Sequence, residues 1–134
     1  MSTIKKEANR ELDAMMAERV MGQPLGMHDM GPEPPYYYLV TTNEHDMHLP
    51  VPAYSNDISA AWQVVMKMIA DGWEFDLQYT NVNETEGEPL EYQWWCSFIY
   101  YTDDENDHRY ESAQGTTAPE AICLAALKAV EAGR

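Results

Sequence analysis

The residues that could hold a metal gather in one polar segment. His45 and His48 have the spacing of metal ligands, and Glu44 and Asp46 lie beside them. A zinc-type site needs further ligands from a second element, and neither a cysteine nor a helical or hairpin spacing supplies them here. We therefore expect solvated loop histidines and no metal.

The residues that could carry catalysis are not arranged for it. Ser97 lies in an aromatic strand without a histidine beside it. His108 follows Asp107, but neighbours in a strand point to opposite faces and do not form a catalytic pair. No nucleophile elbow, P-loop or dinucleotide-binding glycine pattern occurs. We expect a protein that binds a partner or ligand, and no enzyme.

The charge of the chain limits what it can bind. Lys and Arg number 8 against 23 Asp and Glu, a formal net charge of −15. Nucleic acids are held by cations that displace counterions from phosphates, so we expect no nucleic-acid polymer and no anionic membrane as a partner. A small anion can still bind where cations converge, because distant charges are screened. The candidate phosphate ligands are Arg109, Lys67, Lys128, and Arg19 from another subunit.

Aromatic residues concentrate in residues 92–101, which are apolar on both faces of an extended strand. Such a strand is central and covered on both sides, or covered on one side by something outside the domain. Trp95 and Tyr101 share the second face and could stack on a nucleotide base. The alternative is that the rings are core or the interface of a homodimer or higher homo-oligomer.

Polar groups at the expected helix starts could bind ribose or phosphate, because free backbone N–H groups favour anions there. These candidates are Ser55, Asp57, Thr116 and Thr117. Acidic residues cluster instead in the turns of residues 83–91 and 103–107, where they are most simply solvated. The alternative is an acidic decoy that mimics the phosphates of DNA, which requires carboxylates along one long face.

The first part of the chain predicts a helix over residues 7–20, ended by Gly22 and Pro24. Glycines and prolines then predict a loop up to Pro35, a strand over residues 36–42 and a polar surface excursion. We therefore expect one domain of residues 1–134 in which residues 22–52 are an irregular insertion or loop region.

The second helix is expected between a cap at Ser55 or Asn56, reinforced by the charge of Asp57, and a stop at Gly72. Its expected inward face comprises Ile58, Ala61, Trp62, Val65 and Ile69.

The strands that follow are expected at residues 73–81, 92–101 and 108–113, with the last at an edge. Thr117 and Glu120 then form a capping box for the final helix, which closes at Gly133. This order predicts the α+β class. We expect a three-layer α/β/α sandwich with a central antiparallel sheet of about three to four strands and three helices.

The remaining signals concern the compartment. Residues 1–7 lack the apolar segment of a secretory signal, and no run is long and apolar enough to cross a membrane. We expect a cytoplasmic protein in which Cys96 and Cys123 are free core thiols.

Two segments resemble the phage ABA sandwich domain family. They are Val51-Pro52-Ala53-Tyr54-Ser55-Asn56-Asp57-Ile58-Ser59-Ala60-Ala61-Trp62 and Thr117-Ala118-Pro119-Glu120-Ala121-Ile122-Cys123-Leu124-Ala125-Ala126-Leu127-Lys128-Ala129, and Ala17–Gly22 is similar as well. Leu124 stands where the family often has arginine, which removes one candidate phosphate ligand.

The resemblance implies a phage-encoded α/β/α sandwich at work in an infected bacterial cell. Some members resemble a Thoeris anti-defence protein that sequesters a cyclic ADP-ribose isomer made by bacterial TIR proteins. The function implied here is anti-defence: sequestration of a nucleotide-derived immune signal, a cyclic ADP-ribose isomer or a cyclic oligonucleotide, without a cofactor. The alternative is an acidic protein–protein inhibitor or DNA-mimic decoy that acts on a host defence complex.

Overall fold

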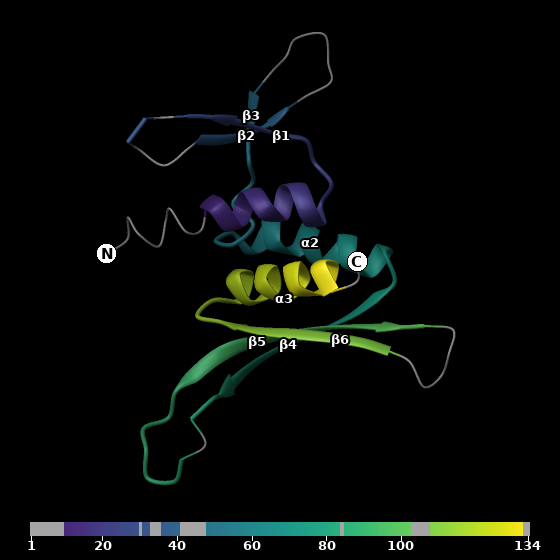
Figure 1. Cartoon of the computed structure of the whole chain (residues 1–134). Coiled ribbons are helices and arrows are strands. Elements are labelled where there is room, and N and C mark those ends of the chain that lie inside the picture. Colours follow the sequence, from purple (N-terminus) through teal and green to yellow (C-terminus); the bar gives the residue numbers. More distant parts are fainter. Residues whose placement is uncertain are drawn as a thin grey trace.

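Two antiparallel sheets and three helical segments make up the fold (Figure 1). The computed structural model describes residues 10–29, 31–32, 36–40, 48–83, 85–102 and 108–132. Residues 10–15 are α-helical and lead directly into the π-helical turn η1 (Met16–Val20). The further elements are β1 (Leu25–His28), β2 (Tyr36–Val40), β3 (His48–Pro50), α2 (Ile58–Ala70), β4 (Trp73–Asn81), β5 (Tyr92–Tyr101), β6 (His108–Gly115) and α3 (Ala118–Ala132).

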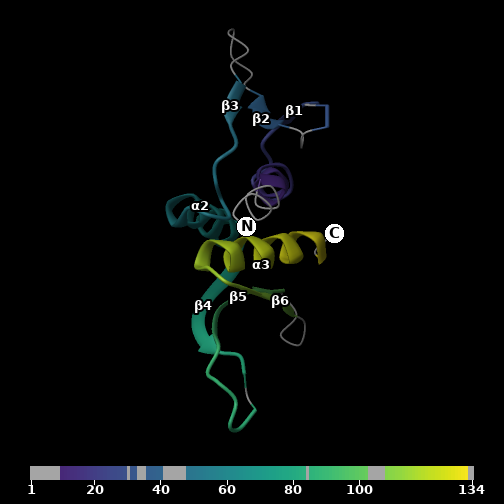
Figure 2. The ribbon, with the colours of Figure 1, turned by 90° about the vertical axis from the view of Figure 1, so that its left-hand side faces the viewer.

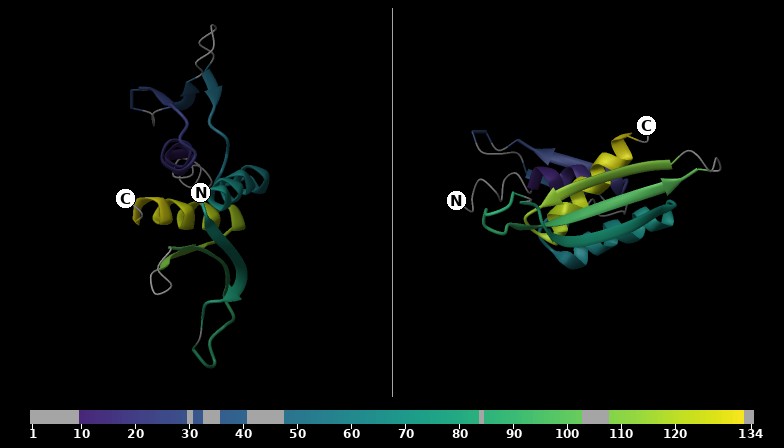
Figure 3. Two further views of the ribbon diagram at one scale, coloured as in Figure 1. Left: turned by 90° about the vertical axis from the view of Figure 1, so that its right-hand side faces the viewer. Right: turned by 90° about the horizontal axis from the view of Figure 1, so that it is seen from below.

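The helices form a layer between the two sheets (Figures 1 and 2). The expected antiparallel α+β sandwich with three helices is confirmed. Within the described ranges, the helices all cover the same face of the β4–β6 sheet and not both faces as expected (Figure 3). The short turns from α2 into β4 and from β6 into α3 bring both helices to that face. We call the face against the helices the inner face and the opposite face the outer face.

The strand order of the larger sheet is β4-β5-β6. The aromatic strand β5 is therefore central, as expected, and β6 lies at an edge. In β4 the side chains alternate as predicted, with Trp73, Phe75 and Leu77 half-buried and Glu74 and Asp76 exposed. This alternation is typical of a strand with one face on the core.

Within residues 22–52, the strand expected over residues 36–42 is present as β2, whereas β1 and β3 lie where a loop and a polar excursion were expected. Here β1, β2 and β3 form a second antiparallel sheet in the order β1-β2-β3. Gly26 lies directly opposite Tyr38, and any side chain on Gly26 would collide with the Tyr38 ring. The Tyr38 ring lies over the backbone of Gly26. This glycine, which suggests a loop in the sequence, is therefore part of a strand pair. Residues 41–47, which include His45, lie outside the described residues.

The start of α2 differs from the prediction by one or two positions. Asp57 is the N-cap, and its Oδ1 accepts a hydrogen bond from the Ser59 N–H at 2.9 Å. Gly72 ends the helix as predicted, since its φ of +101° favours glycine.

The buried face of α2 is rotated relative to the prediction. Its buried residues are Ala60, Ala61, Val64, Val65 and Met68. Three residues expected inside, Ile58, Trp62 and Ile69, are about half exposed, at 51%, 47% and 46%. Alanines on both α2 and α3 are buried, which lets the two helices approach closely, so the small residues lie inward and the large ones at the margin.

The predicted cap of α3 is present, with the Glu120 side chain reaching the residue before Thr117. Thr117 Oγ1 accepts from the Glu120 N–H at 3.3 Å, and Glu120 Oε1 accepts from the Thr116 N–H at 3.2 Å. The core beneath α3 includes Phe98 and Ile122, and Cys96 and Cys123 are free and buried in it as expected. No helix in the described part of the chain is long and apolar enough to span a membrane.

Candidate functional site

The strand register divides the aromatic residues of β5 between the two faces of the sheet. Tyr100 lies opposite both Trp73 of β4 and Arg109 of β6, so these three side chains share the inner face. Trp95 and Tyr101 have the opposite parity and share the outer face. The structure therefore separates Trp95 and Tyr101 from Arg109, and it also separates them from the start of α2, which packs on the inner side.

A hollow of about 330 Å³ opens beside Arg109 at the end of the sheet. Its walls are Trp73, Tyr100 and Thr102, with Ala129 and Val130 from the last turns of α3. The Trp73 and Tyr100 ring centroids are 5.4 Å apart at 57°. Gly72 makes room for this pair, because a Cβ there would lie 2.9 Å from Tyr100 Cε2.

This hollow combines the groups that a nucleotide needs. A guanidinium binds phosphate oxygens through two parallel N–H donors. Aromatic faces stack on bases, at about 1–3 kcal/mol per base. The Thr102 hydroxyl can donate to or accept from ribose or phosphate. Among the sequence candidates, Arg109 is thus the cation that the structure places beside aromatic rings.

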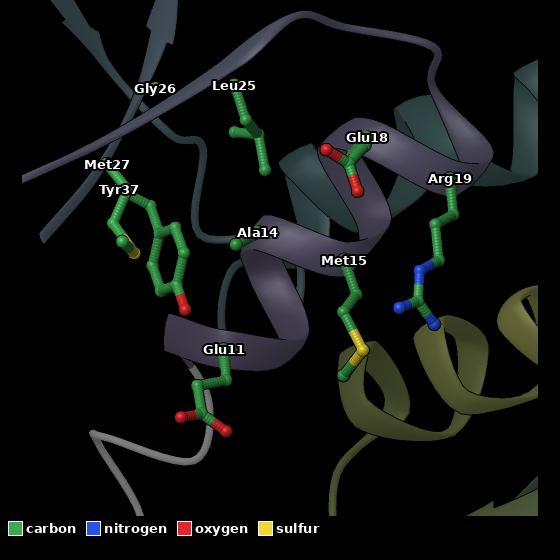
Figure 4. A pocket seen from close by; sticks show the side chains of 9 residues that line it. All are labelled: Glu11, Ala14, Met15, Glu18, Arg19, Leu25, Gly26, Met27 and Tyr37. Carbon is green, nitrogen blue, oxygen red and sulfur yellow. The ribbon is translucent and has the colours of Figure 1, made fainter. Parts of the chain in front are cut away.

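A second cavity, of about 410 Å³, lies between the first helix and the β1–β2 hairpin (Figure 4). Leu25 and Tyr37 line it from the hairpin side, and Glu11, Met15 and Glu18 line it from the helix side. Arg19 also lines the cavity, but its Nη1 is bound to Glu131 Oε1 of α3 at 2.6 Å. With the guanidinium held there, the two carboxylates dominate, so the cavity favours a neutral or cationic group over a phosphate.

Other predicted ligands serve the fold. Ser55 is buried, and its N–H donates to Asp13 Oδ1 at 2.7 Å. Asp57, Thr116 and Thr117 form the caps of α2 and α3 described above, which uses their side chains or N–H groups locally.

The two remaining cations lie apart from the hollow's lining. Lys67 Nζ pairs with Asp71 Oδ2 at 3.2 Å, one turn along α2. Lys128 Nζ donates to the Ser112 carbonyl at 3.2 Å and so ties α3 to β6.

The family model of the phage ABA sandwich domain matches residues 14–127 of the chain. The chain belongs to this family. The match supports the expectation of a phage accessory protein. The fold is also similar to the 2.0 Å crystal structure of a phage protein from Bacillus cereus ATCC 14579, with a TM-score of 0.49 and 21% identity over 92% of this chain and 87% of that one. Comparison with curated proteins gives no match.

Sequence reasoning missed Trp73, Tyr100 and Thr102 as neighbours of Arg109 in this phage ABA sandwich domain. The signal was present in part, since the alternation of β5 places Tyr100 on the face opposite Trp95. What the sequence did not supply was the β5–β6 register that sets Tyr100 against Arg109.

The thiols of the domain are poor nucleophiles. Burial raises the pKa of Cys96 to about 12 and also raises the pKa of Cys123. A thiolate is the reactive form, so neither residue is activated at neutral pH. Within the ranges that the structure describes, no group of three or more His, Cys, Asp and Glu side chains is placed to hold a metal ion.

Proposed function

We propose that this phage ABA sandwich domain is a non-enzymatic anti-defence protein that binds and sequesters a nucleotide-derived immune signal. The ligand class is a cyclic ADP-ribose isomer or a cyclic oligonucleotide. The observation that carries the proposal is the hollow in which Arg109 lies beside Trp73 and Tyr100. In this proposal Arg109 binds phosphate and a ring of the pair stacks on the base.

The local chemistry can outweigh the net charge of −15. Charges farther away than about 8 Å are screened at physiological ionic strength. Among the described residues that line the hollow, the walls are aromatic and aliphatic apart from Arg109 and Thr102, so the charged group of this lining is a cation. A charge-assisted hydrogen bond to phosphate is about twice as strong as a neutral one.

Sequestration requires binding without conversion of the ligand. Within the described lining of the hollow, the side chains offer no thiol, carboxylate or imidazole to act as nucleophile or general base. The ligand is therefore expected to leave the protein chemically unchanged.

The test is calorimetry of the full chain against cyclic ADP-ribose, its isomers, and cyclic di- and trinucleotides. We expect one of these to bind, and the ligand to be recovered intact by mass spectrometry after heat denaturation. Arg109→Ala should weaken binding about tenfold or more, because it removes a charged hydrogen-bond donor. Lys128→Ala is the matched control, since it removes an equal charge outside the lining of the hollow. Silence across the ligand panel, or recovery of a cleaved product, would refute the proposal.

The rival function is the acidic protein–protein inhibitor or DNA-mimic decoy. It is favoured by the charge of −15 and by the outer face of the β4–β6 sheet, against which no described helix or strand packs. A silent ligand panel together with a defined host protein that binds through this face would favour the rival. A DNA mimic would in addition compete with duplex DNA for its target.

A further inference from the structure

The outer face of the β4–β6 sheet carries an aromatic cluster at its centre. Trp95 Nε1 donates to Ser97 Oγ at 3.2 Å, and Ser97 Oγ shares a hydrogen bond with the Tyr110 hydroxyl at 3.0 Å. Ser97 is only 4% exposed although it points away from the helices. The Trp95 and Tyr110 rings therefore form a fixed cover above it, bridging β5 and β6.

Apolar and aromatic area continues around this cluster. Ile99 lies directly opposite Tyr110, and Tyr101, at the end of β5, is 59% exposed. Buried interface centres are enriched in Trp and Tyr, and these rings lose little conformational freedom on binding. The hydrogen bonds to Ser97 already fix two of the rings, which lowers that cost further.

The charges on this face have a single sign. Glu74 lies opposite Ile99, and Asp76 lies opposite Ser97, so both carboxylates flank the cluster on the β4 side. Gln78 Nε2 donates to Asp76 Oδ2 at 2.9 Å. Glu74 and Asp76 are both exposed. The outward positions of β4, β5 and β6 include no Lys or Arg.

We infer that the outer face is a docking surface for a basic protein that presents an arginine to Asp76 and Trp95. Asp76 and Trp95 are diagonal neighbours across β4 and β5, a separation of about 7–8 Å that one long side chain can bridge. A guanidinium can bind a carboxylate edge-on and stack on an indole face at the same time. A lysine ammonium can also approach both groups, but as a point charge it lacks the planar fork of donors, and a neutral side chain forms no ion pair with Asp76.

A second copy of this chain is a poorer occupant. It would bring Glu74 and Asp76 towards a face that offers no lysine or arginine to receive them. Each copy also carries a net charge of −15, which opposes association. The surface lies on the opposite side of the sheet from the Arg109 hollow, so the inference is independent of the proposed ligand.

The test uses the isotope-labelled full chain and three small probes. These are N-acetyl-arginine amide, its lysine analogue, and N-acetyl-citrulline amide, an uncharged isostere of arginine. In two-dimensional NMR we expect the arginine probe to shift the Trp95 indole N–H and the Ser97 amide, and the citrulline probe to leave them unmoved. The lysine probe should shift them less, because it cannot stack as a planar group.

Asp76→Asn keeps an oxygen acceptor for Gln78. It should lower the affinity for the arginine probe about tenfold, because hydrogen bonds to a charged group are stronger than those to a neutral one. Glu88→Gln, in the β4–β5 turn, is the matched control with the same change in net charge. Absence of the Trp95 shift, equal binding of citrulline, or equal loss in both variants would overturn the inference. Shifts of these resonances on dilution without a probe would overturn it in favour of a second copy.

Discussion

The backbone N–H of Ser55 donates to Asp13 Oδ1 at 2.7 Å, and both residues are buried. This bond joins the first helix to the turn that starts α2, 42 residues later in the chain. Burial raises the pKa of Asp13, and the hydrogen bonds from Ser55 oppose part of that rise. The pair therefore couples the position of two helices to the protonation of one carboxyl group.

Replacement of Asp13 separates the hydrogen bond from the charge. Asp13→Ala removes the buried acceptor of the Ser55 N–H, which should lower the free energy of unfolding by about 1–3 kcal/mol. Asp13→Asn keeps an oxygen acceptor and removes the buried charge, so at neutral pH it should be neutral or stabilising. Urea denaturation of both variants measures the difference. An Asp13→Asn protein as unstable as Asp13→Ala would contradict this.

The same residue sets a pH dependence with a definite sign. The folded pKa of Asp13 is raised above the unfolded value, which is about 4. Between the two pKa values the folded state binds more protons, so its stabilising contribution is complete below the unfolded pKa and is lost as the pH rises through the folded one. The difference in the free energy of unfolding between wild type and Asp13→Asn, measured by denaturation at several pH values from acidic to neutral, isolates this contribution. A difference that grows in favour of wild type as the pH rises would show the opposite sign.

Gly115 fixes the approach of β6 to α3. A Cβ on Gly115 would lie 2.6 Å from the Ala121 nitrogen and 3.1 Å from the Thr117 carbonyl oxygen, both backbone atoms. The backbone must therefore move, and Gly115→Ala should destabilise the protein by about 1–3 kcal/mol or more. Its exposed neighbour provides the control, because Gln114→Ala should stay within about 0.5 kcal/mol of wild type. Thermal unfolding of the two variants tests this. Equal unfolding midpoints would show that the contact between β6 and α3 at Gly115 relaxes without cost.

Local signals in the sequence identified the larger sheet and α3. Alternation over Trp73–Asn81, the stop at Gly72 and the capping box at Thr117 each depend on residues a few positions apart, so the sequence alone reveals them. The strand β1 depends instead on Tyr38 covering Gly26 from the neighbouring strand. No pattern within residues 22–29 predicts that pairing.

The inward face of α2 and the residues around Arg109 depend on contacts between distant segments. The hydrophobic spacing of α2 allowed Trp62 to point inwards, but close packing of alanines on α3 selects the side with Ala60 and Ala61. The residue opposite Arg109, Tyr100, is set by the register between β5 and β6. A shift of that register by one residue would have placed Arg109 on the face of Tyr101 instead.

The two cysteines should not react with thiol reagents in the native protein. Cys96, whose pKa is raised to about 12, and Cys123 are both fully buried, so little thiolate forms and reagents have no access. Titration with a chromogenic disulfide at mildly alkaline pH should label neither thiol until denaturant unfolds the chain. Rapid labelling of either thiol without denaturant would show that the core opens locally near β5 or α3.

The two faces of β5 should respond separately to substitution. Tyr100→Leu removes a ring from the Arg109 hollow and should weaken the proposed nucleotide ligand about tenfold, in line with about 1–3 kcal/mol for a stacked base. Trp95→Leu alters only the outer face, so it should leave that affinity unchanged and abolish the shift that the arginine probe causes at the Ser97 amide. Calorimetry and NMR on both variants, with thermal midpoints as the check on folding, make the comparison. Loss of nucleotide binding in Trp95→Leu with Tyr100→Leu unaffected would move the ligand to the outer face, where Arg109 does not reach, and the assignment of the hollow would then be wrong.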